Sequence, residues 1–113
     1  MNVSDYIINF LTQKKVDTIF MITGGQAMFL NDAVCRSKKI KYICNHHEQA
    51  VGMAAEAYGR ISGKLGVALV TAGPASVNVM NGIVGAWEKE NSCRSGRYNC
   101  GCCNESQTKK EIF

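Results

Sequence analysis

Residues 66–74 read GVALVTAGP and contain the clearest strand-to-helix junction in the chain. The run from Gly66 to Ala72 is apolar and bounded by glycines, a pattern typical of a short strand that is buried on both faces. Gly73-Pro74 ends the strand and begins a helix, because proline at a first helical position lacks only an N–H group that would be unpaired there. One stripe of that helix holds Val77, Met80, Val84 and Trp87. The stretch therefore predicts a buried strand followed by an amphipathic helix.

The same alternation of strands and helices extends upstream of this junction. Thr18 to Thr23 has the length and residue types of a buried strand, and Lys41 to Cys44 is a second strand candidate. Helices are predicted from Ser4, a suitable N-cap residue, from about Met28, and from about His46 to Ile61. The last of these is expected to bury a stripe of small side chains and a methionine, namely Ala50, Met53, Ala54 and Ala57. This order predicts an α/β fold, a three-layer doubly wound parallel sheet.

Length, composition and charge exclude several classes of function. The chain has 113 residues, the size of one domain, and 46% of them are apolar, which is enough for a packed core. The net charge of +4 is spread over short basic pairs with no basic stripe, so nucleic-acid binding is not expected. No apolar run approaches the roughly 20 residues of a membrane span, and the first residues lack the basic start of a signal peptide. A cytoplasmic protein without membrane association is therefore expected.

The composition changes after Trp87. From Glu88 onward there is no aliphatic residue until Ile112, and four cysteines fall in this part: Cys93, Cys100, Cys102 and Cys103. We therefore predict a folded domain over residues 1–87 and a Cys-rich irregular tail over residues 88–113 that is not part of the fold. The spacing C-x6-C-x-C-C lacks the paired C-x2-C knuckles of structural zinc, so a zinc site in the tail is the weaker alternative and no metal ligands are assigned.

Three loops are expected at the carboxyl ends of the strands, where parallel α/β sheets have their ligand crevice. These loops are Gly24-Gly25, Asn45 to Gln49, and Thr71 to Asn78. In the middle loop, Asn45 and Glu48 have the spacing of a capping box, which by itself explains both residues. The glycine pair fits a tight strand-to-helix turn and lacks the spaced third glycine of a dinucleotide-binding loop. Each loop, taken separately, leaves a structural and a functional explanation open.

Three motifs in order favour the functional explanation. They are Gly24-Gly25 with Met28 to Ala33, then His47-Glu48-Gln49-Ala50 with Met53 to Arg60, then Gly63, Gly66 and Gly73-Pro74 with Asn78. Together they resemble the N-terminal pyrimidine-binding domain of thiamine-diphosphate-dependent enzymes of the acetolactate-synthase-like kind, including those associated with sugar and surface-polysaccharide pathways. The resemblance covers residues 1–87, and the middle motif is its most specific part.

The resemblance implies a role for each loop. Glu48 matches the catalytic glutamate that hydrogen-bonds the N1′ nitrogen of the cofactor's aminopyrimidine, favours its imino tautomer and so promotes formation of the ylid. Thr71, Pro74 and Asn78 match positions that line the pyrimidine, and Gly24-Gly25 would allow the backbone to approach the ring. Sharing a proton with the ring calls for a raised Glu48 pKa. Since a helix N-terminus lowers that pKa, apolar neighbours such as Val51 and Met53 are expected to outweigh it.

The sequence departs from the family in two places. Ala75 follows Pro74 where the family usually has glycine, and after Trp87 the family's next core strand is missing, so the sheet is expected to be incomplete at its C-terminal end. The resemblance implies a further domain that binds the diphosphate and Mg²⁺, and we expect this chain to lack it. The expected function is thiamine diphosphate binding by an N-terminal fragment of a carboligase or decarboxylase, a transferase or lyase that acts on 2-keto acids by ylid chemistry.

We expect such a fragment to be inactive alone and to form a homo-oligomer or dock on a full-length homologue. Two alternatives stay open at this point. The first is a small interaction protein that docks on a full-length relative, and the second is a truncated product without a function.

Overall fold

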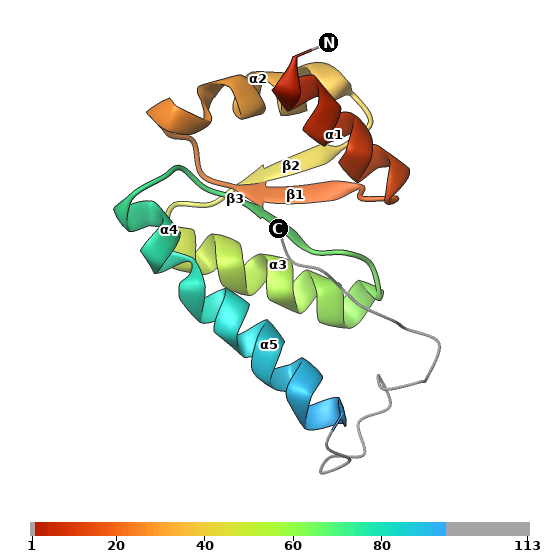
Figure 1. Ribbon diagram of the computed structural model, residues 1–113, viewed down its shortest axis with the longest axis vertical. Helices are drawn as coiled ribbons and strands as arrows, with labels where there is room; N and C mark the ends of the chain where they lie inside the picture. Colours follow the sequence, from red (N-terminus) through yellow and green to blue (C-terminus); the bar gives the residue numbers. More distant parts are fainter. Residues whose placement is uncertain (1, 95–113) are drawn as a thin grey trace.

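The computed structural model describes residues 2–94, and it describes the burial of side chains as far as Glu88. Three parallel strands form its sheet in the order β2-β1-β3 (Figure 1). The central strand is β1 (Thr18–Met21), and the flanking strands are β2 (Lys41–Cys44) and β3 (Val67–Leu69). In this register, Ile19 of β1 lies opposite Tyr42 on one side and Val67 on the other. The chain thus moves to one side of β1 and then crosses to the other, which is the path of a doubly wound sheet.

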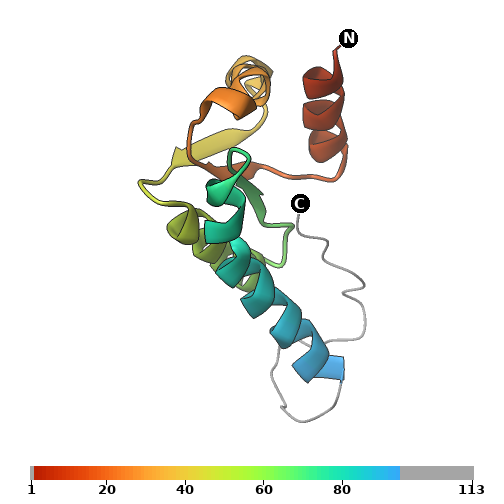
Figure 2. The same ribbon diagram turned by 60° about the vertical axis from the view of Figure 1, so that its left-hand side comes forward.

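Helices cover both faces of this sheet. On one face lie α1 (Val3–Gln13), the 3-10 turn η1 (Gly25–Ala27) and α2 (Met28–Ser37). The other face is covered by α3 (Glu48–Ser62), with α4 (Pro74–Asn78) and α5 (Met80–Arg94) packed against α3. Figure 1 shows α1 and α2 above the sheet and α3 and α5 below it, and Figure 2 shows the same layers from the side. The predicted α/β fold, with a parallel sheet between two helical layers, is confirmed.

The central strand β1 supplies both halves of the core, because successive side chains of a strand point to opposite faces. Ile19 and Met21 are buried among α1 and α2 side chains that include Leu11 and Val34. Phe20 points the other way and packs with Val51, Ala55 and Tyr58 of α3. The Phe20 and Tyr58 rings lie 5.7 Å apart between centroids in a tilted arrangement, which suits an aromatic pair.

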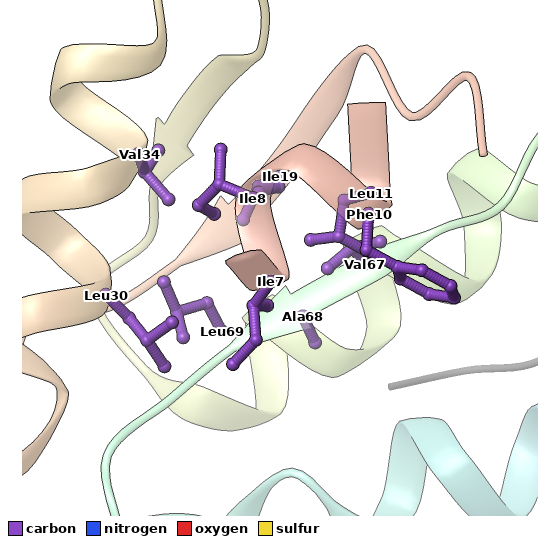
Figure 3. Close-up of a pocket in the computed structure, with 10 residues that line it drawn as sticks. All are labelled: Ile7, Ile8, Phe10, Leu11, Ile19, Leu30, Val34, Val67, Ala68 and Leu69. Atoms are coloured by element: carbon purple, nitrogen blue, oxygen red, sulfur yellow. The ribbon is translucent and has the colours of Figure 1, made fainter. Parts of the chain in front are cut away.

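An apolar cavity of about 340 Å³ lies between α1, α2 and the β1–β3 side of the sheet (Figure 3). Aliphatic and aromatic side chains line it, among them Phe10 and Leu11 of α1, Leu30 of α2 and Leu69 of β3. In the part of the chain that the structure describes, β3 pairs only with β1, so its other edge is open. The cavity therefore lies beside an unpaired sheet edge.

Several local predictions were wrong. Asn2, and not Ser4, caps α1: its Oδ1 accepts a hydrogen bond from the Asp5 N–H at 2.8 Å, while Ser4 lies inside the helix and is buried. The single helix predicted after Gly73-Pro74 is divided at Val79 into α4 and α5.

The face that α3 buries also differs from the prediction. Val51, Gly52 and Ala55 are buried, whereas the side of the helix that carries Met53 faces outward and leaves this side chain 51% exposed. Of the other members of the predicted stripe, Ala50 and Ala57 are exposed, whereas Ala54 is half-buried and packs against the core as predicted. The buried side of the helix is therefore centred on Val51 and Ala55.

The predicted domain boundary between Trp87 and Glu88 lies within α5, which continues to Arg94. Most of the predicted tail, residues 95–113, lies outside the described residues, so the division at Trp87 stays a prediction. Among residues 2–94, no three His, Cys, Asp or Glu side chains are grouped in a way that could hold a metal ion. No helix in this described range is long and apolar enough to cross a membrane.

Candidate functional site

The first and third loops are in direct contact at the carboxyl end of the sheet. A Cβ atom built on Gly24 would lie 2.5 Å from the Thr71 Cβ, so the Gly24 backbone already packs against the Thr71 side chain. The Ser76 hydroxyl, in the first turns of α4, donates to the Thr71 carbonyl oxygen at 3.2 Å. The structure therefore brings two of the three predicted loops together through the backbone of one and a side chain of the other.

The middle and third loops meet through a pair of side chains. Glu48 is the first residue of α3, and its Oε2 accepts a hydrogen bond from Nδ2 of Asn78, the last residue of α4, at 3.2 Å. Both residues are half-buried. Pro74 begins α4 at its first helical position, as predicted, and it is exposed. Ala75, where the resembled family has glycine, is buried.

The N-terminus of α3 is capped by His47 and not by Asn45. The His47 Nδ1 accepts the Gln49 N–H at 3.1 Å, and the His47 carbonyl accepts the Val51 N–H at 3.1 Å. A backbone N–H can only donate, so Nδ1 carries no proton here and a neutral His47 ring has its proton on Nε2. The capping box predicted from Asn45 and Glu48 is therefore wrong, because the helix begins two residues later than that box requires.

Asn45 instead extends the sheet beyond β2. Its backbone N–H donates to the Met21 carbonyl at 2.8 Å, which continues the β1–β2 ladder. Its side-chain Oδ1 is buried and has no hydrogen-bond partner. An unpaired buried acceptor is costly, and such an atom at the carboxyl end of a parallel sheet is an available partner for a ligand N–H group.

The pKa of the Glu48 carboxyl lies below its ordinary value. The largest cause is the hydrogen bond from the residue's own backbone N–H, followed by the one from the Asn78 amide; partial burial raises the pKa and the neighbouring His47 lowers it. The expected dominance of apolar neighbours over the helix N-terminus is wrong in this structure. Val51 is fully buried, but the Met53 side chain points away to solvent. Glu48 is therefore a carboxylate that accepts hydrogen bonds, well suited to a ligand that presents an N–H group.

The two glycines of the first loop have different surroundings. Gly24 has φ of −161°, an extended backbone that any residue can adopt, so a tight turn is not the reason for glycine there. Glycine is needed there because the Thr71 side chain occupies the space that a Cβ atom would fill. At Gly25 a Cβ atom would meet nothing within 4 Å, so the backbone borders open space. The positive φ that only glycine tolerates well occurs at Gly73, with φ of 78° and ψ of −138° just before α4.

These residues fit one half of thiamine diphosphate. A flat aminopyrimidine presents N–H donors and a face, and the loops offer the Glu48 carboxylate, the unpaired Asn45 Oδ1 and the open backbone at Gly25. The diphosphate needs Mg²⁺, a cation that takes carboxylate and carbonyl oxygens. No suitable acidic cluster occurs among residues 2–94, so the described part fits the ring and not the metal.

His47 is the residue of this site to which sequence reasoning assigned no role. A histidine directly before a helix is an uncommon cap, and the usual cap residues Asn and Ser are the ones that a sequence pattern selects. The one feature of the sequence that could have indicated a role for His47 is its position directly before Glu48.

Comparisons with known proteins indicate which family the chain resembles. Residues 1–93 match the family described as "Thiamine pyrophosphate enzyme, N-terminal TPP binding domain". The chain is 36% identical over 83 residues to the chloroplastic acetolactate synthase of Arabidopsis thaliana, covering 74% of this chain and 12% of the plant protein. It is 40% identical over 77 residues to the mitochondrial acetolactate synthase catalytic subunit of Saccharomyces cerevisiae, covering 68% and 11%. It is 35% identical over 80 residues to the acetolactate synthase of Mycobacterium leprae, covering 71% and 13%. The chain thus spans only 11 to 13% of the length of these relatives.

Proposed function

Because the chain belongs to the thiamine pyrophosphate enzymes, within their N-terminal TPP-binding domain, we propose that it binds the aminopyrimidine ring of thiamine diphosphate. The ring would bind at the carboxyl end of the sheet, between the three loops. The observation that carries the proposal is the Glu48 carboxylate, which is positioned at the start of α3 and oriented by Asn78 at 3.2 Å. Every candidate residue that the family resemblance selects lies in one of the loops that meet there.

Each residue has a distinct part in this binding. Glu48 and the ring nitrogen N1′ would share one proton, held in a hydrogen bond between a carboxyl oxygen and that nitrogen. Gly25 allows the ring to approach the backbone, while Gly24 and Thr71 hold the first and third loops in contact. Asn78 and Pro74 line the ring from the start of the α4–α5 segment. When bound, the cofactor supplies the carbanion chemistry with which such enzymes join or cleave 2-keto acids.

Catalysis is proposed for a larger assembly that includes this chain. The described residues offer no acidic cluster for Mg²⁺, so we propose that another domain holds the metal and the diphosphate, and that this chain by itself is inactive. The assembly would be a homo-oligomer or a complex with a full-length homologue, with an acetolactate-synthase-like transferase or lyase activity. Names of relatives include chloroplastic and mitochondrial proteins, and a cytoplasmic location of this chain stays a prediction.

One observation favours docking as a second candidate function. Large apolar side chains are exposed on the outer sides of α3 and α5, with Met53 51%, Val84 48% and Trp87 65% accessible. Exposed apolar surface of this kind is typical of an interaction site. An interaction protein that docks on a full-length relative would use this surface and would not need Glu48.

Binding of thiamine to the purified chain tests the proposal. Thiamine carries the pyrimidine but no diphosphate, so it probes the half-site that the described residues can form. In a ¹H–¹⁵N NMR titration, we expect the amides of Gly25, Glu48 and Gln49 to shift, and Glu48→Gln to remove most of the binding without changing the fold. Glu56→Gln, the other glutamate of α3, is the matched control and should bind as the wild type does. Equal binding by the wild type and Glu48→Gln would contradict the proposal.

A further inference from the structure

Helices α3 and α5 cross in backbone-to-backbone contact at two glycines. A Cβ atom on Gly82 would lie 2.5 Å from the carbonyl carbon of Gly52 and 2.7 Å from its Cα. A Cβ atom on Gly52 would lie 2.9 Å from the carbonyl oxygen of Val79 and 3.0 Å from the Val79 Cγ2. Figures 1 and 2 show α5 running beside α3 on the same side of the sheet. Neither glycine has a positive φ, so the close approach is what requires glycine at both positions.

The crossing lies close to the Glu48–Asn78 pair, because each glycine follows one member of that pair by four residues. Gly52 follows Glu48 by four residues in α3, and Gly82 follows Asn78 by four residues across the division at Val79. One turn of α-helix rises about 5.4 Å, so Gly52 lies one turn after Glu48 in α3, and its nearest neighbour across the crossing is the carbonyl oxygen of Val79, the residue that follows Asn78. The contact at the glycines therefore holds the α3 backbone against the backbone next to Asn78, close to the Glu48–Asn78 hydrogen bond.

The opposite side of the crossing is held by a second link. Arg60, two turns after Gly52, donates from Nη2 to the Gly85 carbonyl of α5 at 3.2 Å and forms an ion pair with Glu56. Arg60 thus joins α3 to α5 below the crossing, and the Glu48–Asn78 hydrogen bond joins α3 to α4 above it. A methyl group inserted at the crossing would open the contact at the end that carries Glu48.

The separation that the added methyl group requires is large compared with the tolerance of the Asn78–Glu48 hydrogen bond. Carbon atoms in contact lie about 3.5–4.0 Å apart, so a Cβ at 2.5 Å from a backbone carbon requires a separation of about 1 Å. The Asn78 Nδ2 to Glu48 Oε2 distance is 3.2 Å, near the long end of the hydrogen-bond range, and about 1 Å more would break it. Glycine in the interior of α3 is less favourable for the helix than alanine, and its close contact offsets this.

We propose that Gly52 and Gly82 are positioning residues, whose backbone contact sets the alignment of Glu48 with Asn78. For catalysis, this inference rests on the proposed role of Glu48. The alignment itself can be measured in the chain without any cofactor. The glycine pair acts through the two side chains and does not touch the ring.

The test uses the full chain with three glycine variants, and its readout is the titration midpoint of the Glu48 carboxyl, followed by ¹³C NMR. Because the Asn78 hydrogen bond lowers the Glu48 pKa, we expect Gly82→Ala to shift the midpoint upward, as Asn78→Ala does. The shift should be smaller in Gly52→Ala, whose closest contacts are longer. Gly59→Ala is the matched control, because this glycine also lies inside α3 and a Cβ atom there would meet its nearest atom, the Lys64 carbonyl oxygen, at the ordinary contact distance of 3.5 Å.

Several outcomes would overturn the proposal. One is an unchanged Glu48 midpoint in a folded Gly82→Ala or Gly52→Ala chain. Another is an equal upward shift in Gly59→Ala. Loss of folding in both crossing variants would also overturn it, because the glycines would then support the whole domain and not the alignment of Glu48. If the midpoint shifts as expected but thiamine does not bind the wild type, the positioning inference stands and the proposed function fails.

Discussion

The Gly24→Ala substitution tests whether the first and third loops are held together as the structure has them. The added methyl carbon would lie 2.5 Å from the Thr71 Cβ, 2.7 Å from Cγ2 and 2.9 Å from Oγ1, so it overlaps the entire side chain. Overpacking of this kind costs typically about 1–3 kcal/mol. Alanine returns about 0.4–1 kcal/mol by restricting the unfolded chain, and the extended backbone at Gly24 adds no strain. We expect a net loss of about 1–2 kcal/mol in the free energy of unfolding.

The neighbouring glycine provides the control. Gly25→Ala places its methyl in open space, with nothing within 4 Å, so the free energy of unfolding should change by less than about 0.5 kcal/mol or rise slightly. Urea denaturation of the full chain, followed by circular dichroism at 222 nm, measures both variants. In the proposed function Gly25→Ala should nevertheless weaken thiamine binding, because its methyl occupies the space offered to the ring.

A double-mutant cycle identifies the partner of Gly24. Thr71→Gly removes all three overlapping atoms, so Gly24→Ala should cost little in that background, with a coupling energy of about 1–2 kcal/mol. Thr71→Ser keeps the Cβ at 2.5 Å and should rescue little. Equal losses in Gly24→Ala and Gly25→Ala, or strict additivity with Thr71→Gly, would refute the contact between the loops.

Three further predictions concern single residues. Hydrogen bonds from Lys64 and Tyr58 lower the Asp17 pKa from 3.8 to about 2, so its contribution to stability is complete above about pH 4 and is lost as pH falls toward 2. Since Asp17 is 45% exposed, the loss should stay below about 1 kcal/mol, and Asp17→Asn should remove this pH dependence from urea midpoints taken at pH 5 and pH 2.5. His47→Ala should destabilise the chain by about 0.5–2 kcal/mol in urea, whereas His47→Asn, which retains an acceptor at the cap, should cost little. Gly73→Ala should lower the thermal midpoint through about 1–3 kcal/mol of backbone strain at φ of 78°, and an unchanged midpoint would contradict the backbone conformation before α4.

The layers of the fold could be predicted from the sequence because apolar runs and breaks are local signals. The strand from Lys41 to Cys44 has the predicted bounds, and β1 lies inside the predicted run from Thr18 to Thr23. The cap of α1 could not be chosen, since Asn2 and Ser4 are both good cap residues, and only the burial of Ser4 in the folded protein decides between them. Local propensity identifies candidate ends, and tertiary packing selects one.

The loops that form the site were predictable for a related reason, and the contacts between them were not. In a parallel sheet all strands end at the same edge, so the positions of Gly24, Glu48 and Thr71 after their strands were sufficient to place these residues near one another. The fit of Gly24 against Thr71 depends on distances through space, and no spacing in the chain encodes it.

The sequence led to the expectation of a raised Glu48 pKa, whereas the structure lowers it. The apolar neighbours in sequence, Val51 and Met53, point to the core and to solvent, so neither covers the carboxylate. Its own N–H and the Asn78 amide hold it as an anion, and burial is the one influence that raises its pKa. A ring that covers the loops would strengthen that influence and weaken the solvation of the charge. The low pKa therefore describes a carboxylate that is ready to accept a hydrogen bond, and in the proposed function the ring that covers it would raise that pKa.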